Sequence, residues 1–475
     1  MEKTSGEELM ERIRKNRVFA AILGFFISMT AATFVDGQSP EGNNCSCAPD
    51  QVIVQLANAS DLPAVAAQYF LNPTPISQVA SPPIYLMQIA NGQTPLQLVT
   101  AMTTPPDPRI TFAEVNRKLS QVEQPGLTWT LGRSWAIGRS WAIGGSAKGY
   151  AKQWFTDRIR LDEAFAAAGT KGRRVDNDQP IVVAVLDTGI DLTHPAFAGK
   201  LTDPSTWHDF VDGDNDPSEV GALRLDPAYG HGTHVSGIVA LTVPDAKIMP
   251  LRILDRDGSG ELWRITAGII WAANHGADVA NLSLGYPEDV RVLHDLLDCV
   301  DVGTTPTGTT FPEIGTHRLA VSVASGNGGN VNFVFPAAET RDGMLSVAAS
   351  TRYDWLASFS SYERHWVDVT APGEEIVSAL PGGRYGMWSG TSMAAPIVAG
   401  ITALVKARYP TTFASPHLLL EHVKETSVDK RFTAAPWVEV RLKRVDALCS
   451  VTNNLACPIP PARPFNSGFE QFLTK

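Results

Sequence analysis

The later part of this 475-residue chain alternates short apolar runs with helical stretches, and this alternation constrains the fold more than any other feature. The stretch Glu261–His275 repeats apolar residues at helical spacing. Strands that alternate with helices form mostly parallel sheets with helices on both faces, so we predict an α/β fold. In that architecture, sites form at the carboxyl ends of the strands. The expected strands, each apolar enough to be buried on both faces, are Ile181–Asp187, Ala246–Leu254, Ala277–Gly285 and Leu319–Asn327.

A smaller unit with a different pattern precedes this region. Its segments are expected in the order strand, helix, strand, strand, helix, strand, which is the ferredoxin-like α+β arrangement. That arrangement hosts many functions, so it indicates little by itself. The six segments are Gln51–Leu56, Ala59–Leu71, Ile76–Ala80, Ile84–Ala90, Thr94–Met102 and Ile110–Val115.

The N-terminus has the pattern of a targeting segment. A polar stretch that ends in the basic residues Arg12, Arg14, Lys15 and Arg17 precedes the uncharged run Val18–Phe34. This pattern predicts a secretory signal peptide. The run also has the minimum length for crossing a bilayer, so an uncleaved N-terminal membrane anchor stays open as the alternative. Either way, we expect the rest of the chain to be exported.

Charge and cysteine content narrow the function classes. The net charge is −10 and the chain has no block of basic residues, which argues against a nucleic-acid partner. Five cysteines are too few for a dense disulfide framework. We expect Cys449 to pair with Cys457 across a short loop, and Cys299 to be a buried thiol. Cys45 and Cys47 are too close to bridge one another easily, and we place them in a flexible linker.

Three short motifs could carry chemistry. Asp187 ends a predicted strand in Asp-Thr-Gly, His231 lies between two glycines at a helix start, and Ser392 opens a long apolar helix in Gly-Thr-Ser-Met-Ala-Ala-Pro. Taken singly, these residues could belong to a turn, a packed helix and a helix cap. An aspartic-protease pair needs a second Asp-Thr-Gly, which the chain lacks. A metal pair of His231 and His234 is disfavoured because no HExxH motif occurs and no carboxylate lies in the motif.

Together, in the order Asp, His, Ser, the three motifs resemble those of the subtilisin family of serine peptidases. The resemblance extends from about Gln153 to Leu448, and it includes the segments QWFTDRIRLDEAF and VDALCS. It implies that Ser392 is the nucleophile, His231 the general base, and Asp187 the group that orients the imidazole. No cofactor is required for this catalysis.

Asn327, in SVASGNGG, matches the residue that this family uses as an oxyanion donor. Two other segments match the strands that hold an extended peptide substrate by β-augmentation. Val334 stands where some members have glycine at the base of the main specificity pocket, so we predict a shallow pocket that prefers medium-sized apolar residues. The expected substrate-binding residues of the two strand segments are Gly258, Ser259, Gly260, Ser283, Leu284 and Gly285.

A calcium site is the one metal site that the sequence suggests. Asp212, Asp214 and Asp216 alternate in DGDNDP in the manner of an oxygen cage, but the rest of an EF-hand is missing. The loop where the family often binds calcium is almost absent. A structural Ca²⁺ site and a solvated turn both stay open.

The resemblance also gives the small N-terminal unit a role. Residues 51–117 lie where family members carry a propeptide that assists folding and blocks the cleft. Residues 118–150 contain the hexapeptide GRSWAI twice in tandem, which we interpret as a slipped duplication in a linker. Maturation is predicted to cleave between Leu131 and Tyr150.

The expected organisation places a targeting segment at 1–35, a linker at 36–50, a propeptide-like domain at 51–117 and a second linker at 118–150. The peptidase domain follows at 151–450 and a tail at 451–475. The expected function is that of an exported serine endopeptidase that acts on proteins or peptides and is made as a self-processing zymogen. The alternatives are a membrane-tethered processing protease and an inactive subtilisin-like binding protein.

Overall fold

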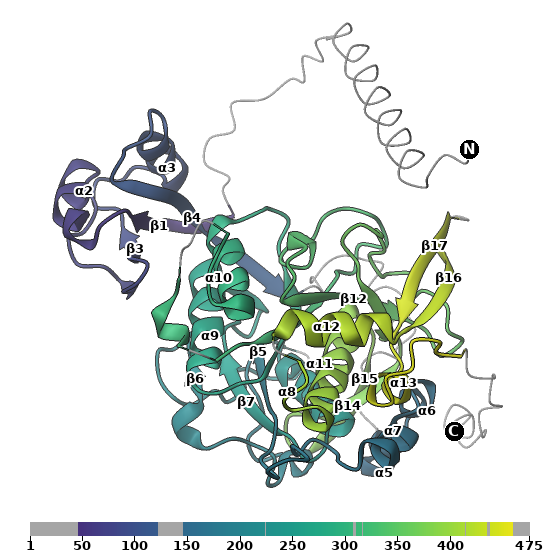
Figure 1. The fold of residues 1–475 in the computed structure, drawn as a ribbon. Coiled ribbons are helices and arrows are strands. Elements are labelled where there is room, and N and C mark those ends of the chain that lie inside the picture. Colours follow the sequence, from purple (N-terminus) through teal and green to yellow (C-terminus); the bar gives the residue numbers. More distant parts are fainter. Residues whose placement is uncertain are drawn as a thin grey trace, which may run out of the picture. The chain divides into compact units, whose positions relative to one another are not determined.

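A nine-stranded sheet forms the centre of the later part of the chain (Figure 1). The computed structural model describes residues 46–121 and 146–458, except 224, 307–309, 316, 414 and 435–437. The strand order is β16-β17-β13-β12-β11-β9-β5-β7-β6, and every neighbouring pair is parallel except β16 and β17. The strands are β5 (Val182–Asp187), β6 (His208–Asp209), β7 (Lys247–Arg252), β9 (Val279–Leu282), β11 (Ala320–Ala324), β12 (Met344–Ser350), β13 (Val369–Pro372), β16 (Val428–Ala434) and β17 (Val438–Arg444).

Helices cover both faces of this sheet, which confirms the predicted α/β fold. Alternate residues of β5 show the two faces, because Val183 and Val185 pack in one hydrophobic cluster and Ala184 and Leu186 in another. The first cluster includes α7, α8, α11 and α12, and the second includes α9 and α10. The helices are α5 (Ala147–Ala151), α6 (Trp154–Arg158), α7 (Leu161–Ala168), α8 (His231–Thr242), α9 (Leu262–Asn274), α10 (Arg291–Val302), α11 (Thr391–Arg408), α12 (Pro416–Glu425) and α13 (Ala447–Val451).

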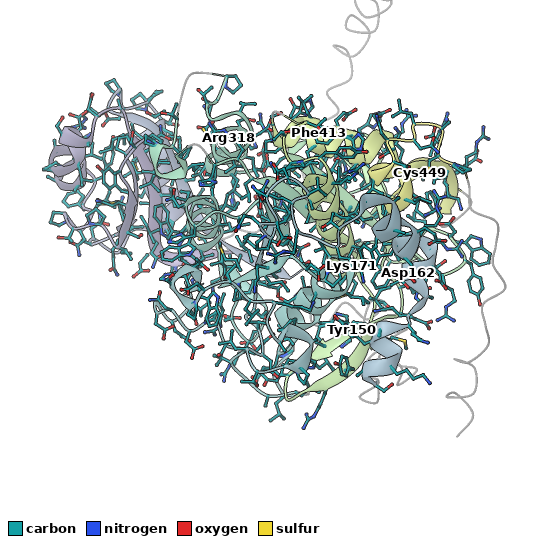
Figure 2. All side chains as sticks on the ribbon, turned by 60° about the horizontal axis from the view of Figure 1, so that its bottom comes forward. Tyr150, Asp162, Lys171, Arg318, Phe413 and Cys449 are labelled. Atoms are coloured by element: carbon teal, nitrogen blue, oxygen red, sulfur yellow. A yellow bond between two sulfur atoms is a disulfide. The ribbon has the colours of Figure 1, made fainter. Side chains whose placement is uncertain are left out.

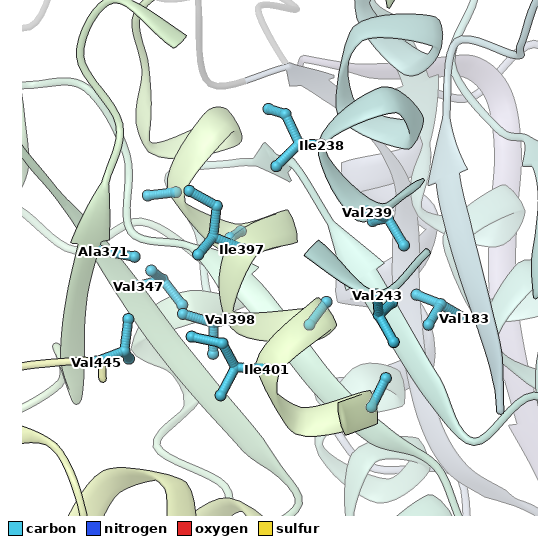
Figure 3. Close-up of a cluster of buried hydrophobic side chains, with 14 of the residues drawn as sticks. Val183, Ile238, Val239, Val243, Val347, Ala371, Ile397, Val398, Ile401 and Val445 are labelled. Carbon is cyan, nitrogen blue, oxygen red and sulfur yellow. The ribbon is translucent and has the colours of Figure 1, made fainter. Parts of the chain in front are cut away.

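Helices α8 and α11 pack against one another and position two of the predicted site residues. Their contact is lined by branched apolar side chains such as Ile238 and Ile397 (Figure 3). Small residues let the two backbones come close, because a Cβ on Gly400 would lie 2.6 Å from the Cβ of Thr242. Helix α11 is apolar on nearly all sides, as expected of a helix inside a large core.

The N-terminal unit has the predicted βαββαβ order. Its sheet has the order β4-β1-β3-β2 with antiparallel neighbours, and its own core lies under α2 and α3. The elements are β1 (Cys47–Leu56), α2 (Leu62–Gln68), β2 (Ser77–Val79), β3 (Ile84–Gln88), α3 (Pro95–Thr103) and β4 (Ile110–Gln121). The described residues all fall within one compact unit.

The structure corrects the predicted linkers. Strand β1 begins at Cys47, inside the expected linker 36–50, because Cys47 pairs with Arg117 of β4 and is buried. Cys47 is also disulfide-bonded, so it does not lie in a flexible segment. The expected linker 118–150 is shorter at both ends, since β4 runs to Gln121 and α5 begins at Ala147. The residues near the end of β4 are polar, so the sequence pattern did not indicate that the strand continues to Gln121. This part of the strand pairs with segments that are far away in the sequence.

The three later cysteines lie as expected. Cys449 (Figure 2) and Cys457 form a disulfide with an S–S distance of 2.09 Å, which ties the start of the expected tail 451–475 to α13. Cys299 is a buried thiol that forms no disulfide, and burial raises its pKa to about 12. No helix among the described residues is long and apolar enough to cross a membrane. The apolar run at 18–34, the GRSWAI repeat and residues 459–475 lie outside the described residues.

Candidate active site

The carboxyl ends of three neighbouring strands bring the predicted site residues together. Strands β11, β9 and β5 are adjacent in the sheet and parallel. Asp187 is the last residue of β5, and Ser283 directly follows β9. Asn327 follows β11 after two residues, and Ser392 is the second residue of α11. The four side chains therefore meet at one edge of the sheet, where α/β folds place their sites.

Asp187 and His231 form a buried pair. The Nδ1 atom of His231 lies 2.6 Å from Oδ1 of Asp187, and each residue is only 1% exposed. The same carboxylate oxygen accepts a hydrogen bond of 2.7 Å from the backbone N–H of Thr188. An imidazole that donates from Nδ1 has its lone pair on Nε2, so this contact prepares His231 to accept a proton at Nε2.

The two glycines beside His231 allow α8 to begin against the end of β5. Gly230 has φ +95°, and a Cβ at this position would lie 2.9 Å from Cδ of Pro381. A Cβ on Gly232 would lie 2.1 Å from the carbonyl oxygen of Gly189. Larger residues at either position would push the helix away, and would separate His231 from its carboxylate partner.

Ser392 is held by a residue that the sequence assigned to the substrate cleft. Ser283 Oγ donates a 3.0 Å hydrogen bond to the carbonyl oxygen of Ser392, and Ser392 Oγ lies 3.4 Å from the carbonyl oxygen of Ser283. In a regular helix the N–H four residues later would bond to that carbonyl, but Pro396 has no N–H. Ser283 thus supplies the donor that Pro396 lacks, and it fixes the start of α11.

The side-chain amide of Asn327 is oriented by Thr391. Its Oδ1 atom accepts hydrogen bonds from the N–H of Thr391 at 2.9 Å and from Thr391 Oγ1 at 3.0 Å. The oxygen end of the amide therefore faces Thr391, and the Nδ2 end faces the other way. A donor in this orientation next to Ser392 could stabilise an oxyanion.

His234 lies on the same helix as His231 but in a different environment. It is fully buried, and its ring stacks on Trp388 with a centroid separation of 4.8 Å and an interplanar angle of 8°. Burial, and as a second cause the nearby His231, lower the pKa of His234 to about 3. His234 is therefore a neutral packed residue.

The predicted walls of the substrate cleft are two strand edges, and β4 pairs with both. Strand β8 (Ser259–Glu261) follows a turn at Gly258, which has φ +75°, and β10 (Leu284–Gly285) follows Ser283. Both pair antiparallel with the end of β4. The residue pairs are Lys118 with Glu261, Leu119 with Gly260, Ser120 with Ser259 and Gly285, and Gln121 with Leu284.

Val334 lies beside the oxyanion segment. It is partly buried, and its Cγ2 atom is 2.7 Å from the position that a Cβ on Gly326 would take. The Val334 side chain thus packs directly on the backbone of Gly326, the residue before Asn327.

The three aspartates suggested as a calcium site are not brought together. Arg252 Nη1 binds the carboxylates of Asp209 at 2.6 Å and Asp212 at 2.5 Å. Asp214 and Asp216 accept hydrogen bonds from backbone N–H groups two residues later. Within the described ranges, these carboxylates do not belong to a group whose ligand atoms lie within 4.8 Å of one another. The donor set does not fit Ca²⁺, because a guanidinium already neutralises Asp212.

Sequence reasoning missed two residues of the site. Thr391 directly precedes Ser392, so the Gly-Thr-Ser motif itself was a signal for it. Glu219, in the segment NDPSEVG, lies in none of the three motifs, yet its carboxylate accepts hydrogen bonds from the residues around His231. No local pattern singles out Glu219, because its partners lie on a distant helix.

Comparison with known proteins gives the family. A family model described as the subtilase family matches residues 178–443. The chain belongs to the subtilase family. It is 40% identical over 236 residues to a thermophilic serine proteinase from Bacillus sp. (strain AK1), which covers 48% of this chain and 52% of that protein. This subtilase is also 33% identical over 268 residues to thermitase from Thermoactinomyces vulgaris, covering 54% of this chain and 83% of thermitase.

Among solved structures, a cold-adapted subtilisin-like serine proteinase is similar with a TM-score of 0.48 and 26% identity, covering 63% of this chain and 99% of that one. Of the thermophilic serine proteinase from Bacillus sp. (strain AK1), the chain spans about half the length. By family, its domain around β5, α8 and α11 is a serine endopeptidase domain of the subtilisin type.

Proposed function

We propose that this subtilase is an exported serine endopeptidase that hydrolyses proteins or peptides and is made as a self-processing zymogen. Ser392 attacks the substrate carbonyl while His231 takes its proton, and His231 then gives that proton to the leaving amine. Asp187 holds the imidazole in the required tautomer and stabilises the imidazolium. The Nδ2 of Asn327 and the backbone N–H of Ser392 donate to the oxyanion.

The observation that supports the zymogen is the position of β4. A peptide substrate bound by β-augmentation would run antiparallel between β8 and β10, and the end of β4 occupies that place. While β4 stays there, a substrate cannot pair with the same two edges. The N-terminal unit therefore fits the role of an intramolecular inhibitor.

Polar side chains of β4 attach this unit to the peptidase domain, and two of them bind at the start of a helix or at a strand-helix junction. Asn116 is fully buried, donates to Oε2 of Glu261 at 3.0 Å and accepts from the N–H of Trp263 at 3.1 Å. Glu114 accepts from the N–H of Arg291, at the start of α10, at 2.5 Å. A carboxylate at a helix N-terminus is stabilising, so Glu114 favours the inhibited arrangement.

The proposed substrate preference rests on Val334. A valine that fills the space beside Gly326 leaves less depth than a glycine would, so we expect cleavage after Ala, Leu or Met rather than after Phe or Tyr. Export rests on the N-terminal apolar run, and we favour secretion over a membrane anchor. Detergent-free recovery of the enzyme from the medium tests this, and recovery only from membranes would contradict it.

The decisive experiment compares wild type with Ser392→Ala, and uses the exposed Ser205→Ala as the matched control. We expect wild type and the control to remove the N-terminal unit and to react with a serine-directed fluorophosphonate. Ser392→Ala should stay full-length and unlabelled. N-terminal sequencing of the mature enzyme should find its start between Leu131 and Tyr150. A folded wild type that neither processes itself nor reacts with the probe would refute the proposal.

A further inference from the structure

Glu219 contacts residues next to both members of the buried Asp187–His231 pair. Its Oε1 atom accepts hydrogen bonds from the N–H and from Oγ1 of Thr233, each at 3.0 Å, and its Oε2 atom accepts from the N–H of Gly230 at 3.0 Å. Thr188 Oγ1 lies 3.3 Å from both carboxylate oxygens. Thr188 follows Asp187 in the chain, whereas Gly230 and Thr233 lie on either side of His231.

The start of α8 depends on this carboxylate. Its N-cap residue is Gly230, which has no side chain to accept a hydrogen bond, so the first N–H groups need partners from elsewhere. Glu219 accepts from the N–H groups of Gly230 and Thr233, and Thr188 Oγ1 accepts from that of Gly232 at 2.9 Å. The N–H of His231 bonds to the carbonyl oxygen of Ala228 at 2.9 Å. Every N–H around His231 is thus satisfied, two of them by Glu219.

A carboxylate suits this position better than a neutral group would. Only an ionised carboxylate accepts at both oxygens without carrying a proton of its own. The N-terminus of α8 also favours a negative charge. Burial raises the pKa of Glu219, and the neighbouring charge of Asp187 raises it further, while the hydrogen bonds from Gly230 and Thr233 oppose this shift.

We propose that Glu219 is a positioning residue that fixes Asp187 and His231 relative to one another. Glu219 binds Thr188 on one side and the start of α8 on the other, and it thereby holds together the two segments that carry the 2.6 Å contact. This inference rests on the proposed function, in which that contact prepares His231 as the base. The competing explanation is that Glu219 only caps α8, and that it contributes to the stability of the protein but not to catalysis.

The test uses Glu219→Gln and Glu219→Asp in the full chain. Gln has the same size, but its amide nitrogen would face an N–H donor on one side. Asp keeps the charge but is one methylene shorter. We expect kcat of Glu219→Gln to fall about 10- to 100-fold with KM changed less than about threefold, because small misplacements of reacting groups cost that much. Glu219→Asp should recover part of the loss.

A matched control removes a carboxylate that lies at the N-terminus of a different helix. Asp162 is exposed on the first turn of α7 (Figure 2), and Asp162→Asn should leave kcat unchanged. If Glu219→Gln lowers the melting temperature but retains the kcat of wild type, Glu219 is only a cap and the proposal is wrong.

A second readout does not require activity. In the Ser392→Ala background, the downfield proton signal of the hydrogen bond between His231 Nδ1 and Asp187 should shift or broaden in Glu219→Gln and stay unchanged in Asp162→Asn. An unchanged signal in Glu219→Gln would overturn the positioning role even if the protein proved to be no peptidase. Conversely, an inactive wild type with the expected signal change would refute the proposed function and leave the positioning role standing.

Discussion

Thr391 holds the amide oxygen of Asn327 with two hydrogen bonds, one from its backbone N–H and one from its hydroxyl. Thr391 is also the residue before Ser392, so the expected nucleophile and the expected oxyanion donor are fixed through one residue. The hydroxyl in turn accepts a 3.1 Å hydrogen bond from the N–H of Gly326. The side-chain oxygen of Asn327 is therefore held by the first residue of α11.

Replacing Asn327 by Ala should lower kcat about 10²- to 10³-fold with little change in KM. This magnitude was measured on subtilisin, a relative of this protein, and we apply it here. The reason is that the donor acts on charge that develops only in the transition state. Thr391→Val keeps the backbone hydrogen bond but removes the hydroxyl, so its kcat should lie between those of wild type and Asn327→Ala. Steady-state kinetics on a peptide anilide would measure both, and equal kcat values for wild type and Asn327→Ala would contradict the oxyanion role.

Replacing Asp187 by Asn should lower kcat by about 10⁴-fold, as in other serine proteases with this substitution. The amide keeps the size of the side chain, but its NH₂ group would favour the wrong tautomer of His231. The melting temperature should stay close to that of wild type. A kcat loss smaller than tenfold, measured on correctly folded protein, would show that the Asp187–His231 contact does not prepare the base.

Replacing Val334 by Gly should deepen the main specificity pocket. We expect kcat/KM for substrates with Phe before the scissile bond to rise about 10-fold relative to those with Leu, because a few methyl groups in a pocket have effects of this size. A peptide library profiled with both enzymes would measure the change. Wild type that already cleaves better after Phe or Tyr than after Ala, Leu or Met would contradict the shallow pocket.

The buried His234 should make the protein less stable in acid. Its pKa of about 3 in the folded state is below the unfolded value of about 6.5. The contribution to stability is fully present above pH 6.5, and it is lost as the pH falls toward 3, because the unfolded chain then binds one more proton. The slope from this group is about 1.4 kcal/mol per pH unit.

Thermal or chemical unfolding between pH 7 and pH 4 would measure this effect in the Ser392→Ala background, which prevents self-digestion. His234→Phe keeps a ring against Trp388 and should show a shallower dependence on pH. The same slope in both proteins would mean that His234 does not contribute.

We expect no calcium to bind at the loop of Asp212, Asp214 and Asp216, because Arg252 neutralises Asp212. Asp214→Asn removes one charge but keeps an oxygen for the N–H of Asp216. Adding a chelator should therefore change the melting temperature of wild type and of this variant by the same amount. A chelator effect in wild type that the variant lacks would show that the loop binds calcium.

The sequence could predict the residues that meet at the edge of the sheet. Asp187 ends an apolar run, and Ser392 and His231 open helices, so their places follow from local patterns and from the rule that α/β sites form at strand ends. The βαββαβ order of the N-terminal unit followed from periodicity in the same way. Local hydrophobic patterns are reliable in these cases because burial in the core enforces them.

The sequence alone thus determined the α/β fold, the order of the motifs and the residues that can do the chemistry. Only the tertiary structure decided that Ser283 replaces the hydrogen bond that Pro396 lacks, that Arg252 binds Asp212, that β4 continues between β8 and β10, and that Glu219 connects Thr188 to the start of α8. Each of these contacts joins residues that are far apart in the sequence. The contact of Ser283 also depends on the missing backbone N–H of Pro396. A polar side chain in a loop carries no local sign of its partner, because that partner is chosen by how the helices and strands pack.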